Sequence, residues 1–169
     1  GGGVNICVNR SIDMTCIVAL KHDGSIYMGG DRIAAKNGGR FTTKSPKIFH
    51  NGQFLIGYTT SFRMGQILEY KFNPPEFSRD GVMKYLVGDF IDELRKCLKD
   101  AGYAEVNNNV ETGGSFLLGF MGNIYSVGGD FQVLDSMDDE MAVGSGEDLA
   151  RAALFSTRGN DDPYERIRI

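Results

Sequence analysis

The stretch from Met14 to Arg32 constrains the fold of this chain more than any other part of the sequence. Thr15 follows a methionine and opens an apolar run, and a His-Asp-Gly turn separates that run from a second one ending in two glycines. Two short apolar runs around an Asp-Gly turn predict a β-hairpin with strands over Thr15–Leu20 and Ser25–Gly29. The hairpin would carry the Thr15 hydroxyl at one strand end and the Asp31 carboxylate at the far end of its partner.

The composition indicates a single domain and argues against several classes of function. The 169 residues are 41% hydrophobic and carry a net charge of -4, with no long basic run, so we expect neither a nucleic-acid nor a membrane-surface binder. No apolar run is long enough to span a membrane, and the first residues do not resemble a signal peptide. The three cysteines lack CxxC spacing and there are two histidines, so we expect reduced thiols in a cytoplasmic protein, with no metal site and no cofactor.

The remaining sequence alternates between strand and helix patterns. Further strands are predicted over Val4–Val8, Lys47–His50, Gln53–Tyr58, Ser115–Phe120, Asn123–Val127, Gln132–Leu134 and Met141–Val143. Helices are predicted after a Ser61 cap, over Asp80–Gly102, over Glu147–Thr157 and after Asp162. The segment from Gly38 to Ser45 indicates a loop or an edge strand, and Tyr103–Gly114 a polar connection. This order predicts an α+β fold in which packed sheets are covered by helices, a four-layer αββα sandwich.

Three short motifs predict local geometry. Asn51-Gly52 is typical of a type I′ turn, and Met121-Gly122 joins the strands on either side of it. In Asp162-Pro163-Tyr164-Glu165, the aspartate would cap a helix and Glu165 would complete a capping box. Gly102 is expected to end the long helix. Cys16, directly after Thr15, is expected to face the core.

The motifs around the first hairpin resemble those of proteasome β-subunits and their bacterial single-ring relatives, which are N-terminal nucleophile (Ntn) hydrolases. Asp31 and Lys47 follow Thr15 at the intervals of that family without a gap. Taken alone, Asp31 would be a turn carboxylate and Lys47 a surface lysine, but their joint spacing behind one threonine favours the family. Ala142-Val143-Gly144-Ser145-Gly146 matches the Gly-Ser-Gly turn that precedes the third helix in family members.

The resemblance implies a role for each catalytic residue. Thr15 would be the nucleophile and its own α-amine the base. Lys47 would lower the pKa of that amine, Asp31 would orient Lys47, and Ser145 would support the amine.

The resemblance also implies which residues contact the substrate. The Ser61 N–H would donate to the oxyanion, at a position where the family usually has glycine. Thr59 would line the pocket for the substrate side chain. Gly144 and Gly146 would let the backbone approach closely.

The order of the chain differs from that of the family. Gly1–Val8, GGGVNICV, resembles the strand that closes the family fold. Residues 1–13 are therefore expected to correspond to that last strand and residues 14–169 to the N-terminal and central part, which makes 1–169 one circularly permuted domain. A leader or tag is the alternative. Because Met14 precedes Thr15, the Thr15 nitrogen is an amide, and activity requires cleavage of the bond between them.

These features predict a threonine peptidase subunit. The family resemblance implies peptide or unfolded-protein substrates, a homo-oligomeric ring and an AAA+ ATPase partner. Two alternatives stay open at this point, namely a small-molecule amidase or acylase on the same fold and a catalytically silent structural ring subunit.

Overall fold

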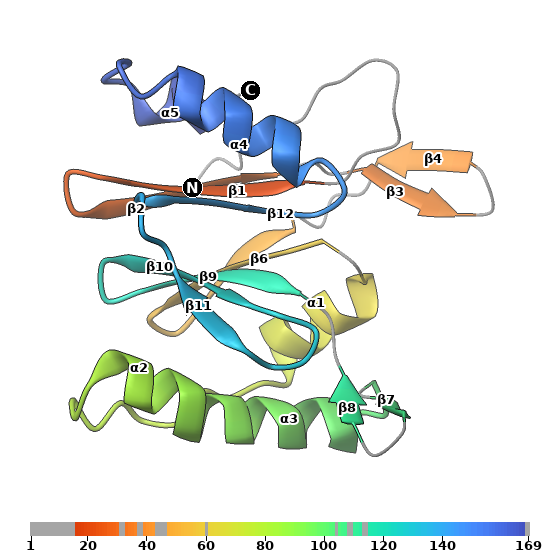
Figure 1. Cartoon of the computed structure of the whole chain (residues 1–169). Coiled ribbons are helices and arrows are strands. Elements are labelled where there is room, and N and C mark those ends of the chain that lie inside the picture. The colour runs from red at the N-terminus through yellow and green to blue at the C-terminus, as the bar shows by residue number, and fades with distance from the viewer. Residues whose placement is uncertain are drawn as a thin grey trace.

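Two antiparallel sheets form the centre of the structure (Figure 1). The computed structural model describes residues 16–30, 33–36, 39–42, 47–59, 61–103, 105–107, 110–112 and 115–167. A three-stranded sheet has the order β12-β1-β2, with β1 at Ile17–His22, β2 at Ser25–Gly30 and β12 at Glu140–Val143. A five-stranded sheet has the order β11-β10-β9-β6-β5, with bounds Val133–Asp135, Asn123–Val127, Phe116–Phe120, Phe54–Tyr58 and Ile48–Asn51.

Helices lie on the outer face of each sheet (Figure 1). Helices α4 (Glu147–Ser156) and α5 (Pro163–Ile167) cover the three-stranded sheet. The five-stranded sheet is covered by α1 (Phe62–Tyr70) and by a continuous helical run of α2 (Val82–Tyr85), the π-helical η1 (Leu86–Phe90) and α3 (Ile91–Asp100). The described part of the chain is thus a mixed α/β fold with two stacked antiparallel sheets.

Strand β1 divides its side chains between two cores, as the period of two in a strand requires. Cys16, Val18 and Leu20 pack with Ala150, Leu154 and Ile167 of the covering helices. Ile17 and Ala19 point the other way and pack between the sheets with Leu117, Ile124 and Val143. Cys16 is 1% exposed, which confirms that it faces a core.

Gly57 lets the two sheets approach each other near Ile17. A Cβ on Gly57 of β6 would lie 2.7 Å from Ile17 Cγ2, and a Cβ on Gly30 of β2 would overlap Ile17 Cδ1. A side chain at Gly57 would therefore displace Ile17 from its packing between the sheets, whereas the overlap at Gly30, in the same sheet as Ile17, involves the tip of the Ile17 side chain.

Most of the predicted strands and turns are confirmed within the described residues. The first hairpin turns at Asp23 and Gly24, with φ of 48° and 78°, and the β9–β10 hairpin turns at Met121 and Gly122, with φ of 49° and 75°. Both pairs have the positive φ values of a type I′ turn. The predicted strand Val4–Val8, and with it Thr15 and Asp31, lies outside the described residues.

The type I′ turn predicted at Asn51-Gly52 is wrong. Asn51 pairs with Phe54, so Gly52 and Gln53 form the turn, and of these two only Gly52 has a positive φ, 58°. The physical reason lies in the Asn51 side chain, whose Nδ2 donates to the carbonyls of Leu68 at 2.7 Å and Phe72 at 2.8 Å. Asn51 thereby binds one carbonyl in the last turn of α1 and one just beyond the end of this helix.

Two helix predictions need correction. The helix expected over Asp80–Gly102 begins at Val82 and ends at Asp100, with the π-helical η1 inside it, although Gly102 adopts the expected left-handed φ of 71° just after it. The Asp162 carboxylate accepts from Tyr164 N at 2.9 Å, but Glu165 accepts from Asn160 Nδ2, so no capping box closes. The Asp162 N–H donates to Asn160 Oδ1 instead.

Two hairpins occupy stretches in which at most a loop, an edge strand or a polar connection was predicted. Strands β3 (Ile33–Lys36) and β4 (Gly39–Thr42) pair with each other, as do β7 (Glu105–Asn107) and β8 (Val110–Thr112). None of the described helices is long and apolar enough to cross a membrane.

Because two tyrosines are buried, we expect the protein to lose stability in strong alkali. Burial, assisted by the nearby carboxylates of Glu69 and Asp89, raises the pKa of Tyr58 and of Tyr85 from 10.0 to about 12. Above pH 10 the unfolded chain loses these protons while the folded chain keeps them, so the free energy of unfolding should fall by a few kcal/mol as the pH approaches 12. Urea titrations from pH 9 to 12 should show a smaller decline for the Y58F/Y85F variant. Replacing the exposed Tyr70 with Phe should leave the decline unchanged.

Candidate active site

Five strand ends meet at one end of the stacked sheets. Ile17 at the start of β1 pairs with Gly30 at the end of β2 and with Val143 at the end of β12. On the facing sheet, Ile48 at the start of β5 pairs with Gly57 near the end of β6. Ile17 lies directly against Gly57. The chain segments that continue from these five ends therefore leave the sheets close to one another.

Most of the predicted site residues flank these strand ends. Lys47 directly precedes β5, Thr59 directly follows β6, and Ser61 caps α1. The turn of Gly144, Ser145 and Gly146 directly follows β12. Thr15 and Asp31, which precede β1 and follow β2 in the sequence, lie outside the described residues. The fold thus brings together the strands that lead to every predicted site residue, while the roles of those residues stay predictions.

Lys47 is a buried lysine, so the alternative of a surface lysine is wrong. It is 3% exposed, and its Nζ lies 5.5 Å from the centroid of the Phe62 ring. Its backbone is fixed as well, because Tyr58 N donates to the Lys47 carbonyl at 3.0 Å. Lysine is almost never fully buried without compensation, since desolvating an ammonium group is costly. Its burial at this end of the sheets therefore requires neighbouring groups that compensate the charge.

Ser61 begins helix α1 with a side-chain cap. Its Oγ accepts from Met64 N at 3.3 Å, and its extended backbone, φ -146° and ψ 124°, turns the chain into the helix. The predicted cap is confirmed. Thr59, two residues earlier, is buried, with 8% of its surface exposed.

The turn after β12 has the geometry that its glycines permit. Gly144 has a φ of 112°, a conformation that residues with a Cβ avoid. Its carbonyl accepts from Glu147 N at 3.2 Å, and Gly146 N-caps α4. Ser145 lies exposed between the two glycines. The predicted strand-to-helix turn is confirmed, and it presents a hydroxyl at the end of the sheets where Lys47 is buried.

Helix α1 is held against β6 through a glycine. A Cβ on Gly65 would overlap the Tyr58 ring, which is itself 3% exposed. The Tyr58 and Phe62 rings form a T-shaped pair with their centroids 6.2 Å apart. Ser61, Phe62 and Gly65 share the first turns of this helix. The position of the helix therefore sets the positions of the Ser61 backbone and the Phe62 ring together.

Replacing Gly65 with Ala should displace α1. Because the added methyl group overlaps the buried Tyr58 ring, we expect the free energy of unfolding to fall by about 1–3 kcal/mol. Gly88→Ala is the matched control, since a methyl group there would meet no atom within 4 Å, and it should be neutral or slightly stabilising. Chemical denaturation of both variants checks this, and equal stabilities would contradict the close packing of Gly65 on Tyr58.

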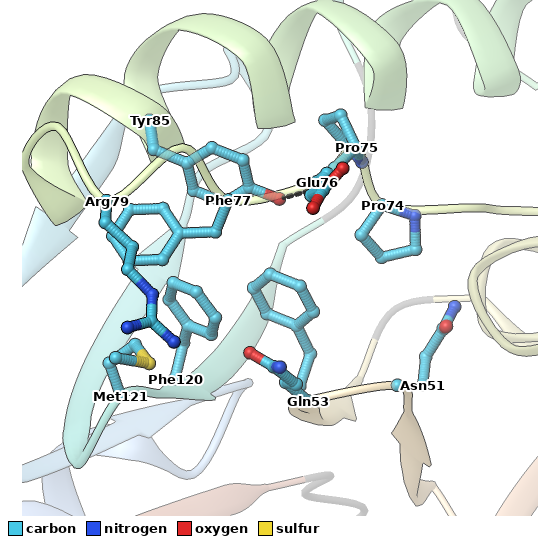
Figure 2. A pocket seen from close by; sticks show the side chains of 12 residues that line it. Asn51, Gln53, Pro74, Pro75, Glu76, Phe77, Arg79, Tyr85, Phe120 and Met121 are labelled. Atoms are coloured by element: carbon cyan, nitrogen blue, oxygen red, sulfur yellow. Dashed lines mark hydrogen bonds between the residues drawn. The ribbon is translucent and has the colours of Figure 1, made fainter.

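A pocket of about 330 Å³ lies away from this site (Figure 2). It opens near the turn residues Gly52 and Met121, at the opposite end of β5 and β6 from Lys47 and Thr59. Phe77 and Tyr85 form one wall, and Tyr85 Oη donates to the Pro75 carbonyl at 2.5 Å. No sequence motif indicated this pocket. Within the described residues, no group of three or more His, Cys, Asp or Glu side chains could hold a metal ion.

Solved structures share this fold. BPH from Thiobacillus denitrificans, a bacterial proteasome homologue, superposes with a TM-score of 0.74 at 21% identity, covering 91% of this chain and 85% of that one. This chain has a proteasome-like fold. BPH in complex with epoxomicin gives a TM-score of 0.73 at 22% identity, with the same coverage of 91% and 85%.

More distant proteins share the proteasome-like fold too. Eukaryotic HslV from Trypanosoma brucei gives a TM-score of 0.59 at 17% identity, covering 91% of this chain and 86% of that one. The Anbu complex from Pseudomonas aeruginosa, which forms a helical assembly, gives 0.60 at 12% identity and covers 90% and 69%. Neither a protein-family model nor a curated protein sequence matches this chain. At these identities the likeness establishes the proteasome-like fold alone, so the reaction is argued from the residues.

Proposed function

We propose that this chain is a threonine peptidase subunit whose nucleophile is Thr15, freed as an N-terminus by cleavage of the Met14–Thr15 bond. The observation that carries the proposal is the burial of Lys47 at the end of the sheets where β1 begins. A buried ammonium group there would place a positive charge beside the first residue of β1. This is the field that an amine base needs if it is to be unprotonated near neutral pH.

The alternation along β1 supports this placement. Cys16 and Val18 face the helices, whereas Ile17 and Ala19 face the other sheet. Ile17 packs against Gly57 of β6, the strand that leads to Thr59, and Lys47 directly precedes the neighbouring strand β5. Cys16 points away from that space, so it is not a substitute nucleophile.

The proposed reaction has two halves. The Thr15 amine takes the proton from Thr15 Oγ, and Oγ attacks the peptide carbonyl carbon. The Ser61 N–H donates to the oxyanion, and the amine passes its proton to the leaving nitrogen as the peptide bond breaks. Water then hydrolyses the resulting ester by the same proton transfers and restores the hydroxyl.

In this proposal, five further residues assist the reaction. Asp31 orients Lys47, which lowers the pKa of the amine. Ser145 supports the amine, and Thr59 lines the pocket for the substrate side chain. Gly144 and Gly146 allow the turn that carries Ser145 to approach.

The proposal extends to the architecture of the whole subunit. The stacked sheets with helices on both outer faces support the four-layer αββα arrangement of the Ntn hydrolases, with residues 1–13 as the closing strand of a permuted domain. Met83 and Val87 on the α2–η1 surface are 36% and 55% exposed, and they support a homo-oligomeric ring with contacts along this helix. Peptides or unfolded proteins are the proposed substrates, with an AAA+ ATPase as the proposed partner.

Freeing Thr15 in the folded chain tests the proposal. A specific protease site placed directly before Thr15 and cut after folding retains residues 1–14 and creates the amine. We expect the cut protein to hydrolyse fluorogenic peptides and to gain the mass of epoxomicin, whereas the uncut protein and a cut Thr15→Ala variant do neither.

Other outcomes would overturn the proposal in different ways. A cut protein that hydrolyses acyl amides but no peptide would be an amidase or acylase. A cut protein that is folded, inert toward both substrates and unmodified by epoxomicin would be a structural subunit.

A further inference from the structure

We propose that Phe62 is a positioning residue that holds the Lys47 ammonium through the face of its ring, and this inference rests on the proposed function. Phe62 is the first residue of α1 and is partly buried. Lys47 Nζ lies over its ring, 5.5 Å from the centroid. Attraction between a cation and a ring is effective within about 6 Å and strengthens when both partners are desolvated.

The burial of Lys47 explains why a ring is useful there. Lysine carries its charge on a flexible four-carbon stem, so the ammonium needs contacts that fix its direction as well as its charge. At 3% exposure, little solvent reaches the residue to weaken the attraction of the ring. A phenyl ring also bears no net charge, so it attracts the ammonium without cancelling the positive field that the Thr15 amine is proposed to use.

The ring is itself held in place by the packing of β6 against α1. The Phe62 and Tyr58 rings meet edge to face, at an interplanar angle of 82°. The Tyr58 ring lies over the Gly65 backbone and contacts Phe49 at a centroid distance of 6.2 Å. Edge-to-face pairs are a favoured aromatic geometry, so Tyr58 fixes the plane that Phe62 presents to Lys47.

The same helix turn then links two parts of the proposed site. Ser61, the proposed oxyanion donor, directly precedes Phe62 at the start of α1. A shift of this helix end would move both the N–H and the ring. The position of Phe62 therefore determines both the direction of the Lys47 charge toward the amine and the place of the neighbouring oxyanion donor. No sequence motif indicates this role.

Stepwise fluorination of Phe62 tests this role with little change in shape. Fluorine withdraws density from the ring face, so 4-fluoro-, 3,5-difluoro- and 3,4,5-trifluorophenylalanine should lower kcat of the cut protein progressively, by about tenfold for the last, with KM unchanged. Phe62→Tyr should retain activity, and Phe62→Leu should lose at least as much as the trifluoro variant. The same series at Phe155, whose ring faces Arg158 at 4.6 Å on the surface, should not alter kcat.

A readout that needs no catalysis separates this inference from the proposed function. The ring current of Phe62 should shift the Lys47 ε-methylene protons upfield in wild type and in Phe62→Tyr. In Phe62→Leu the shift should disappear and the Lys47 side chain should become more mobile. Absence of the shift in wild type, unchanged Lys47 order in Phe62→Leu, or a flat fluorine series would each overturn the positioning role. A present shift in a cut protein that is inert toward peptides would instead overturn the peptidase proposal.

Discussion

Replacing Lys47 with Met in the cut protein is expected to lower kcat/KM for peptide hydrolysis by about 10³-fold, within the range that acid–base groups contribute. Met fills much of the same volume, so the buried position stays occupied while its charge is lost. The Thr15 amine would then return toward the ordinary pKa of an α-amine, about 7.7–8.0, and would be largely protonated near neutral pH. The remaining activity should rise with pH, which shifts the optimum upward.

The control for this variant is a lysine on the surface. Lys99 lies exposed near the end of α3, and Lys99→Met should leave kcat/KM unchanged. Circular dichroism and thermal melts establish that both variants fold. A Lys47→Met protein that folds and keeps full activity would show that Lys47 has no part in the reaction, and the peptidase proposal would lose the observation that carries it.

The second large effect concerns the stability of the helices that cover the three-stranded sheet. Glu140 at the start of β12 accepts from Arg166 Nη2 at 2.8 Å and from Arg158 Nε at 2.8 Å. Arg166 is 6% exposed and also donates to the Leu154 carbonyl. Glu140→Gln keeps the shape but leaves the Arg166 charge buried without a counter-charge, so we expect the free energy of unfolding to fall by about 3–5 kcal/mol.

A surface neighbour provides the comparison for Glu140. The Asp138 carboxylate lies 3.7 Å from Arg158, and its side chain is 71% exposed. Asp138→Asn should therefore cost at most about 1 kcal/mol. Combining Glu140→Gln with Arg166→Met should recover part of the lost stability, because the uncompensated charge is then removed. Equal costs for Glu140→Gln and Asp138→Asn in urea unfolding would show that the buried pair does not stabilise the helices.

Local patterns predicted the strands well because their signals act over a few residues. Asp23-Gly24 and Met121-Gly122 adopt the positive φ values that their hairpins require. Asn51-Gly52 carries an equally strong signal and fails, because Asn51 finds partners at the end of a helix that lies far along the chain. Hydrogen bonds to a distant helix end cannot be predicted from a pattern of two residues.

The other errors also come from contacts beyond the local sequence. The π-helical segment Leu86–Phe90 lies between two α-helical stretches, with Leu86 and Phe90 both fully buried against the large core. An α-helical repeat of apolar residues predicts a helix there but not its extra residue per turn. Strands β7 and β8 have three residues each. Three residues are too few to show the alternation of apolar and polar side chains that predicts a strand.

The sequence predicted which residues belong to the candidate site, but it did not predict how their side chains pack. The spacing of Lys47 behind Thr15 indicated its importance, but nothing in the sequence indicated that its ammonium meets the face of Phe62. That contact depends on where α1 begins relative to β5, and Gly65 and Tyr58 determine this in three dimensions. Thr15 and Asp31 stay predictions, since they lie outside the described residues.

The pairing of β1 with β12 has a consequence for the order in which the molecule acquires its structure. Ile17 and Val143 are partners in one sheet although most of the described chain lies between them. Each hairpin can close locally and quickly, but this pairing needs the closure of a very long loop, which is slow and requires β12 to have been synthesised. A nascent chain therefore carries the first hairpin long before it carries a completed sheet. The three-stranded sheet is therefore completed only after β12 has been synthesised.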